Sequence, residues 1–399
     1  MTAIHLRELI GPELGGLRAI RRDLHAHPEL GYQEQRTAAV VRRELEGLGI
    51  RVVAGLAGGT GVVGHLPATA AFASDRPAVG LRADMDALPI SEQTGLPYAS
   101  TQAGIMHACG HDGHTAVLLG VARVLSKVPR RPHAVTLVFQ PAEEGGGGAE
   151  RLCKEGLMEG RLTGTPIGRM FGLHGWPELG LGTVGTRPGP LLASTDELRV
   201  TILGVQSHGA YPQYARDAVL AASHCIVAVQ SVVSRNVGPL ESAVVTIGMI
   251  QGGTATNVIP EAVSFSGTVR ALTPAVRRML RQRVTEVIEH TALAFGCRAQ
   301  VDWNDGYPVT NNDPALVGEF MRLAREAFGE KRVVEMAQPT MGGEDFSYYG
   351  QKVPAVFFCL GLKPEGQVRY ATLHQPDFDF NDDALPIGVE MFCKLALAE

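Results

Sequence analysis

The segment VTLVFQPAEEG, residues 135–145, gives the first indication of the fold of this chain. Residues 135–139 are apolar or β-branched and predict a buried β-strand. Two adjacent carboxylates, Glu143 and Glu144, follow directly after the expected end of that strand. Adjacent carboxylates at a strand end can diverge, so that one binds a metal ion and the other takes a proton from a reacting water. An acidic turn without chemistry is the alternative interpretation of this segment alone.

Helical and strand-like segments alternate around this strand. Further strands are predicted at 61–66, 78–82, 170–173 and 355–360, and helices at 14–25, 35–48, 115–128, 314–328 and from 383 onward. This alternation predicts an α/β domain with a mainly parallel sheet flanked by helices. In open α/β sheets ligands bind at the carboxyl ends of the strands, which is where the polar motifs of this chain occur.

The order of elements changes in the middle of the chain. The predicted elements there are a strand at 192–203, a helix at 217–234, strands at 243–250 and 263–271, a helix at 274–295 and a strand at 298–303. The order β-α-β-β-α-β is that of the split βαβ, or ferredoxin-like, unit. We therefore expect an inserted α+β domain at 189–301, between two parts of the metal-binding α/β domain at 1–188 and 302–399.

Composition narrows the class of protein. The 399 residues suggest about two domains. The net charge is −5 and no long Lys/Arg block occurs, which argues against nucleic acid or an anionic membrane as a partner. We expect no apolar run long enough to span a bilayer and no signal peptide at residues 1–7. The six cysteines form no CxxC pair, so we expect a reducing, cytoplasmic location.

The strongest motif is MHACGHDGH, residues 106–114. It gathers three His, one Cys and one Asp within eight residues of a chain that has 13 His. A thiolate and an imidazole two residues apart, Cys109 and His111, can bind one metal, or the thiolate can bridge two. A helix N-terminus with polar caps is the alternative. HExxH, G-x-S-x-G and the phosphate-loop signature are all missing from the chain.

Two single histidines follow predicted strands or lie far along the chain. His174 occurs in LHGWP (173–177) and His374 in LHQP (373–376). A lone His is more often structural than a ligand, and these two gain weight because the other motifs need partners. The five candidate ligands are then Cys109, His111, Glu144, His174 and His374. Five are too many for one open catalytic zinc, which takes three, and suit two metals that share a ligand.

These residues lie in stretches that together resemble the M20 metallopeptidase family. The likeness is to its amidohydrolase branch, which includes hippurate hydrolases, N-acyl amino acid amidohydrolases (aminoacylases) and plant auxin-conjugate hydrolases. The matching stretches are LHAHPEL (24–30), LRADMDALPI (81–90), MHACGHDGH (106–114), FQPAEEGGGGA (139–149), LHGWP (173–177), GGTATNVIP (252–260), GGEDFSYY (342–349) and LHQPDFDFND (373–382). They follow the family's order over nearly the whole chain.

The resemblance implies a role for each candidate ligand. Cys109 would bridge two divalent metals (Zn, Mn, Co or Ni), with His111 and His174 on one and Glu144 and His374 on the other. Glu143 would be the general base. Asp84 stands where the peptidase branches have a ligand His, and it is not assigned as a ligand. Asp86 and Asp112 are expected to support the site, because metal-binding imidazoles usually donate their second N–H to an acceptor.

The resemblance also implies functions for the inserted domain. It matches the family's dimerisation or lid domain, which predicts a homodimer in which His208 reaches the partner's active site and stabilises the oxyanion. Asn257, Arg270 and Gly343 match substrate-contacting positions. After Pro212 the sequence reads QYARDA (213–218) where the branch usually has His-x-Gly-x-Asp-Pro, so the family's substrate preference is not carried over.

The predicted activity is metal-dependent hydrolysis of the amide bond of small N-acyl amino acids. One alternative is a di- or aminopeptidase of the same family, which would need a group that holds a free α-amine. The other is a catalytically inactive metal-binding protein. The presence of Glu143 beside every type of ligand argues against that alternative, because a pure binder needs no base.

Overall fold

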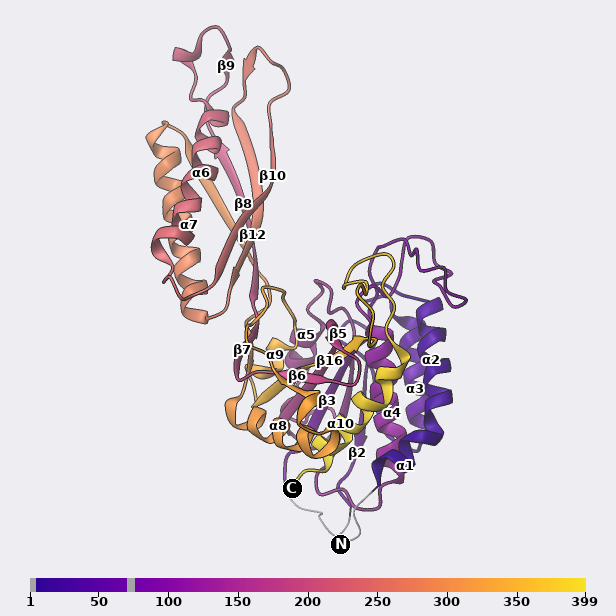
Figure 1. Ribbon diagram of the computed structural model, residues 1–399. Coiled ribbons are helices and arrows are strands. Elements are labelled where there is room, and N and C mark those ends of the chain that lie inside the picture. The colour runs from indigo at the N-terminus through magenta and orange to yellow at the C-terminus, as the bar shows by residue number, and fades with distance from the viewer. Residues whose placement is uncertain (1–4, 70–75) are drawn as a thin grey trace. The chain divides into compact units, whose positions relative to one another are not determined.

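In the computed structural model, which describes residues 5–69 and 76–399, the chain divides into two units (Figure 1). Unit 1 lies within Met1–Gly189, Asn311–Gln338 and Asp345–Glu399, and unit 2 comprises Pro190–Thr310 and Pro339–Glu344. The sequence predicts that the inserted domain ends at residue 301. Unit 2 extends to Thr310 because its last strand, β13 (Arg298–Asp305), pairs along its whole length with a strand of the same unit, and Gly306 and Tyr307 after it also hydrogen-bond to that strand. The part of the N-terminus at residues 1–4 lies outside the described residues.

Unit 1 is built on an eight-stranded sheet with the strand order β1-β2-β4-β3-β5-β16-β6-β15. The four central strands β4, β3, β5 and β16 are mutually parallel, whereas β2 runs antiparallel to β4. The mainly parallel sheet is therefore confirmed at its centre. The strands are β1 (Arg51–Leu56), β2 (Gly61–Leu66), β3 (Ala78–Asp84), β4 (Val135–Gln140), β5 (Ile167–Gly180), β6 (Val184–Thr186), β15 (Val333–Glu335) and β16 (Ala355–Lys363).

The helices of unit 1 cover this sheet. α4 (His111–Lys127) packs on β3 and lies beside α2, α3 and α10, and Figure 1 shows α2 and α3 next to it. Its residues 111–122 are all buried, as expected of a helix covered on every side. The other helices are α1 (Leu6–Ile10), α2 (Leu14–Ala26), α3 (Gln35–Gly47), α5 (Gly148–Lys154), α8 (Pro314–Phe328), α9 (Ser347–Gly350) and α10 (Leu385–Leu397).

Unit 2 has the predicted ferredoxin-like order. Its four-stranded sheet runs β10-β12-β8-β13, every neighbouring pair is antiparallel, and α6 and α7 lie side by side on one face (Figure 1). The larger elements are β8 (Ser194–Leu203), α6 (Ala218–Asn236), β10 (Ala243–Gly252), β12 (Ala262–Ala271) and α7 (Pro274–Ala294). Burial alternates along β8, which is the pattern of a strand with one face on a core.

One expectation about apolar runs was wrong. Among the described residues, α6 is long and apolar enough to cross a membrane by length and composition, with 19 residues and a mean hydropathy of 1.4. In the structure this helix packs one face into the core of unit 2 through Ala221, Cys225, Val229 and Val232. Only 33% of this apolar window is buried, so packing within unit 2 covers part of the run.

Candidate metal centre

The strongest motif lies at the N-terminus of α4, which starts at His111, four residues before the predicted start. The residue before the helix, Gly110, has φ 87°, and a Cβ there would lie 3.1 Å from the ring of Phe380. Only glycine fits this left-handed, crowded turn without strain. The turn places Cys109 and His111 on the same side of the helix start, above the carboxyl ends of β3 and β4.

The first group of donors consists of Cys109, His111 and His174, all buried, with donor atoms within 4.8 Å of one another. The Sγ of Cys109 lies 3.3 Å from Nε2 of His174. His111 directs Nδ1 at the backbone carbonyl of Asp86 at 2.8 Å, and His174 directs Nδ1 at the carbonyl of Gly175 at 2.8 Å. A ring N–H that donates to a carbonyl fixes the tautomer and leaves Nε2 free to bind a metal.

The second group shares its thiol with the first. Cys109, Glu144 and His374 also bring their donor atoms within 4.8 Å, and Nε2 of His374 lies 3.1 Å from Oε1 of Glu144. His374 has φ 63°, a left-handed conformation that is uncommon for non-glycine residues. Because Cys109 belongs to both groups, its sulfur is placed where it can bridge two ions.

The chemistry of the donors fits divalent cations. Nε2 of His111 is buried and makes no hydrogen bond within the described residues. Burial and the carboxylates of Glu144 and Glu143 raise the pKa of the Cys109 thiol, so a nearby cation is needed to hold it as a thiolate. Burial lowers the pKa of His174, which keeps this imidazole in the neutral form that binds metal. The two donor groups therefore support two metal ions.

Glu143 lies beside the donors. It is buried, and one of its oxygens lies within 4.8 Å of donor atoms of His111 and Glu144. It directly follows Ala142, which has φ 52°. The two carboxylates of the strand-end pair thus both reach the same cluster.

Asp86 and Asp112 have different surroundings. The carbonyl of Asp86 faces His111, and its carboxylate accepts a hydrogen bond from the backbone N–H of Glu144 at 2.9 Å. Asp112 instead lies 3.0 Å from Arg21 and 2.8 Å from Nδ1 of His25. Burial opposes ionisation of Asp112, but Arg21 and His25 hold the pKa of its carboxyl well below the usual value. Asp112 therefore anchors α4 to α2 rather than accepting from the candidate ligand imidazoles.

Two structural facts were not predicted. His174 does not end a strand, because β5 continues to Gly180 alongside β16. No role is predicted for His114 of the motif. In the structure its Nδ1 lies 2.6 Å from Asp84, and its Nε2 accepts the backbone N–H of Gly175 at 2.8 Å. The signal for His114 was its spacing of three from His111, which puts both rings on one helix face. Its partner on the sheet could not be read from the sequence.

Asp84 itself lies fully buried between Arg82 (2.7 Å) and His114. Asp84→Asn is expected to lower the free energy of unfolding by about 1–3 kcal/mol, because the buried Arg82 then keeps only one of its two carboxylate partners, Asp345. Urea unfolding measures this, with the exposed Asp302→Asn as control. A loss below about 1 kcal/mol for Asp84→Asn, within the range for ordinary surface substitutions, would contradict a structural role for this pair.

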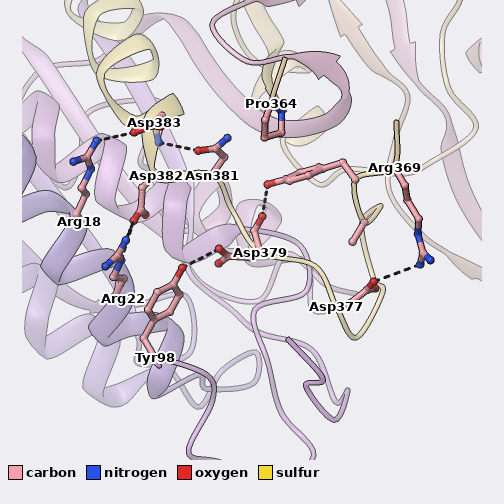
Figure 2. Close-up of a pocket in the computed structure, with 12 residues that line it drawn as sticks. Arg18, Arg22, Tyr98, Pro364, Arg369, Asp377, Asp379, Asn381, Asp382 and Asp383 are labelled. Carbon is pink, nitrogen blue, oxygen red and sulfur yellow. Dashed lines mark hydrogen bonds and ion pairs between the residues drawn. The ribbon is translucent and has the colours of Figure 1, made fainter. Parts of the chain in front are cut away.

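A pocket of about 630 Å³ opens beside the C-terminal segment that follows His374 (Figure 2). Three arginines line it, and each pairs with an aspartate: Arg18 with Asp383, Arg22 with Asp382 and Arg369 with Asp377. Figure 2 shows these pairs together with the hydrogen bond from Tyr98 to Asp379. The pairs formed by Arg18 and Arg22 tie the segment to α2, so the pocket's charged groups support the chain near His374.

The remaining candidates lie in unit 2. His208 is exposed in β9 (Ser207–His208), which pairs with β11 (Val258–Ile259), and its Nδ1 accepts the N–H of Ala210 at 3.0 Å. Asn257 directly precedes β11, and its carbonyl accepts the N–H of Gly209 at 2.7 Å. Arg270 lies half-buried in β12, and Gly343 packs closely on Thr195. Backbone pairing thus brings His208 and Asn257 close together within unit 2.

The chain is similar to known proteins. Residues 80–398 match the model of peptidase family M20/M25/M40. The chain is 42% identical over 370 residues to the N-acetyl-L-cysteine deacetylase of Bacillus subtilis (strain 168), covering 92% of this chain and 84% of the relative. It is 41% identical over 382 residues to the IAA-amino acid hydrolase ILR1-like 4 of Arabidopsis thaliana, covering 94% and 84%.

A solved structure is also similar over both units. The Bacillus subtilis YXEP protein, described as a dinuclear metal binding peptidase from the M20 family, matches with a TM-score of 0.83 and 33% identity, covering 97% of this chain and 98% of that one. The family match spans more than half of the chain, and these relatives share over 30% of its residues across most of its length. This chain therefore belongs to peptidase family M20/M25/M40.

Proposed function

We propose that this protein is a metal-dependent amidohydrolase that hydrolyses the amide bond of small N-acyl amino acids to a carboxylic acid and a free amino acid. The observation that carries the proposal is a buried carboxylate, Glu143, beside two donor groups that share Cys109. Relatives named as N-acetyl-L-cysteine deacetylase and IAA-amino acid hydrolase support the substrate class.

Each residue of the site has a task in this reaction. When bound, the two divalent ions polarise the acyl carbonyl and make a water more acidic. Glu143 takes the proton of the attacking water and returns it to the leaving amine. His208, from the partner subunit, donates a hydrogen bond to the oxyanion, a contribution typically worth about 10²–10³ in rate. Asn257, Arg270 and Gly343 contact the substrate.

The chemical types of the donor atoms suggest which metal ions support the activity. The thiol of Cys109 favours zinc, whereas the imidazoles and the carboxylate of Glu144 also suit Mn²⁺, Co²⁺ or Ni²⁺. We propose that one of these four ions supports the activity, with Cys109 as the bridging ligand, His111 and His174 on one ion, and Glu144 and His374 on the other.

A substrate panel tests the proposed function. Protein supplied with Zn²⁺, Mn²⁺, Co²⁺ or Ni²⁺ is assayed for amine release from N-acetyl, N-benzoyl and longer N-acyl amino acids, with free dipeptides as the comparison. We expect hydrolysis of N-acyl amino acids with at least one metal and its loss after chelation. Cleavage of dipeptides alone would identify a peptidase, and release from no compound with any metal would contradict the proposal.

We also propose a homodimer that forms through unit 2. The strand β10 lies at an edge of its sheet and is exposed over most of its length, and α6 carries exposed apolar side chains. These exposed residues are Val219, Leu220 and Val227 on α6 and Met249 and Ile250 on β10. Exposed sheet edges need to be covered or paired, and a two-fold interface pairs identical surfaces in one step.

A complementation experiment tests whether sites are shared between subunits. Glu143→Gln and His208→Ala are each expected to lose at least about 10²-fold of the turnover, and mixing them under conditions of subunit exchange should restore activity. A mixed dimer then has one site with an intact Glu143 and an intact partner His208. No recovery despite demonstrated exchange, or a fully active monomer by light scattering, would contradict the shared site.

We place the enzyme in the cytoplasm. All six cysteines are free and buried, which is compatible with a reducing compartment. Fractionation of the source cells with an antibody to the chain would test this, and recovery outside the cytoplasm would contradict it.

A further inference from the structure

The loop after β4, residues 141–148, reverses the chain through an unusual backbone conformation. Ala142 has φ 52°, which an alanine seldom adopts without support from its surroundings. Its carbonyl accepts the N–H of Gly148 at 3.2 Å, which closes the loop. Because Ala142 directly precedes Glu143, the conformation of this residue sets the direction in which the Glu143 side chain leaves the loop.

Glu34 holds Ala142 from a distant part of the chain. Its carboxylate is buried, Oε1 accepts the N–H of Ala142 at 2.9 Å, and Oε2 accepts the hydroxyl of Thr60 at 2.7 Å. Burial raises the pKa of this carboxyl. Placing a carboxylate there carries a desolvation cost, which its hydrogen bonds to Ala142 and Thr60 offset in part.

The position of Glu34 at the start of α3 does not explain its burial. It occupies the residue before the first helical turn, but its side chain makes no capping hydrogen bond. Glu29 performs that task, since its carboxylate accepts the N–H groups of Arg36 and Thr37 at 2.9 and 2.8 Å. The side chain of Glu34 therefore bonds to Thr60 and to the loop that bears Glu143 instead of to its own helix.

Two neighbours of Glu34 contact the same loop. A Cβ on Gly31 would lie 3.1 Å from Cβ of Ala142, so a larger residue here would have to displace Ala142 by a few tenths of an ångström. The hydroxyl of Tyr32 donates to the carbonyl of Gly146, and Arg151 stacks over the Tyr32 ring at 4.1 Å. Residues 31–34 thus contact the loop on both sides of Glu143.

We propose that Glu34 is a positioning residue for the reaction, because its hydrogen bond to Ala142 fixes the backbone that presents Glu143. The proposal rests on the proposed function for its catalytic consequence, since it assigns Glu143 as the base. A general base must lie within hydrogen-bond reach of the proton it takes. A displacement of about 1 Å caused by a remote substitution can cost about 10²-fold in rate.

Three variants test the proposal by kinetics. Glu34→Ala is expected to lower kcat about 10–100-fold with KM and metal content unchanged. Glu34→Gln is expected to recover kcat to within about threefold of wild type, because its amide oxygen can accept from Ala142 while its NH₂ donates to Thr60. Glu46→Ala, an exposed glutamate on the same helix α3, is the matched control and is expected to keep wild-type kinetics.

Glu34→Asp covers the case in which Glu34→Ala does not fold. It keeps a carboxylate but is one methylene too short to reach Ala142 and Thr60 together, so kcat is again expected to fall with KM unchanged. A folded Glu34→Ala or Glu34→Asp with kcat within twofold of wild type would overturn the proposal. So would an equal loss in Glu34→Gln, because a fold that merely needs the charge would not be rescued by the amide.

Hydrogen–deuterium exchange separates this proposal from the assignment of the activity. The amide of Ala142, read in a peptide covering residues 139–149, is expected to exchange at least 10-fold faster in Glu34→Ala than in wild type and in Glu46→Ala. Equal exchange in all three would overturn the positioning role even in an active enzyme. If Glu34→Ala exchanged faster but the wild-type protein hydrolysed no N-acyl amino acid, the hydrogen bond from Ala142 to Glu34 would be confirmed and the proposed function would be wrong.

Discussion

Glu143→Gln is expected to yield a folded, metal-loaded protein whose kcat is about 10²–10⁴-fold below that of the wild type, the range that general acid–base catalysis contributes. Glutamine keeps the size and the hydrogen-bonding shape of the side chain but cannot take the proton of the attacking water. The fold should tolerate the change, because Glu143 lies on a loop held by the backbone contacts of Ala142 and Gly145.

Steady-state kinetics on the best substrate of the panel, with metal content measured on the same sample, decides this prediction. Glu178→Gln is a suitable control, because Glu178 is exposed on β5 of the same unit. Near-wild-type turnover by Glu143→Gln, with both metals present, would mean that another group acts as the base.

Cys109→Ala is expected to abolish turnover and to weaken metal binding at both positions by at least about 100-fold. The sulfur belongs to both donor groups, so its removal takes one ligand from each ion. Loss of an outer partner of a ligand alone costs about 10–100-fold in affinity, and loss of the ligand itself should cost no less. In Cys109→Ala, the buried Nε2 of His111 would also have one fewer neighbouring ligand with which to bind a metal ion.

Equilibrium dialysis against Zn²⁺ followed by elemental analysis measures this effect. Cys153→Ala is the matched control, because Cys153 is a buried cysteine of unit 1 outside the donor groups. If Cys109→Ala retained two ions per chain at wild-type affinity, the shared thiolate would be wrong.

Much of the fold could be predicted because its signals are local. The apolar run at 135–139 became β4, the alternation of helix and strand gave the parallel centre of the sheet, and the order of the middle elements gave the four-stranded sheet of unit 2. Short strands such as β6 and the edge strand β15 have three residues each, which is too few for a periodic pattern, and they were not predicted.

The donor groups could be proposed because metal-binding residues cluster in motifs. Cys109 and His111 are two residues apart, and Glu144 follows a strand. His174 and His374 entered only as partners that those motifs needed, and the structure brings both into the donor groups. The hydrogen bonds that support the donor groups could not be predicted. The contacts of Asp84 with His114 and of Glu34 with Ala142 join residues 30 and 108 positions apart.

The surroundings of Asp112 illustrate the same limit. Its place beside His111 in the sequence suggested a partner for a candidate ligand imidazole, but successive residues of a helix point in different directions. The structure turns Asp112 toward Arg21 and His25 of α2 instead. Which side chain meets which across two packed elements depends on the packing itself, and that information is not contained in local spacing.

The central claim is that one thiolate, Cys109, joins two metal ions into a single hydrolytic centre. Crystals of the metal-loaded protein, measured at the absorption edge of the bound metal, test it most directly through anomalous difference density. We expect two peaks about 3.5–4 Å apart, each about 2.3 Å from the Sγ of Cys109. A single peak at full occupancy, or two peaks of which only one lies within bonding distance of Cys109, would contradict it.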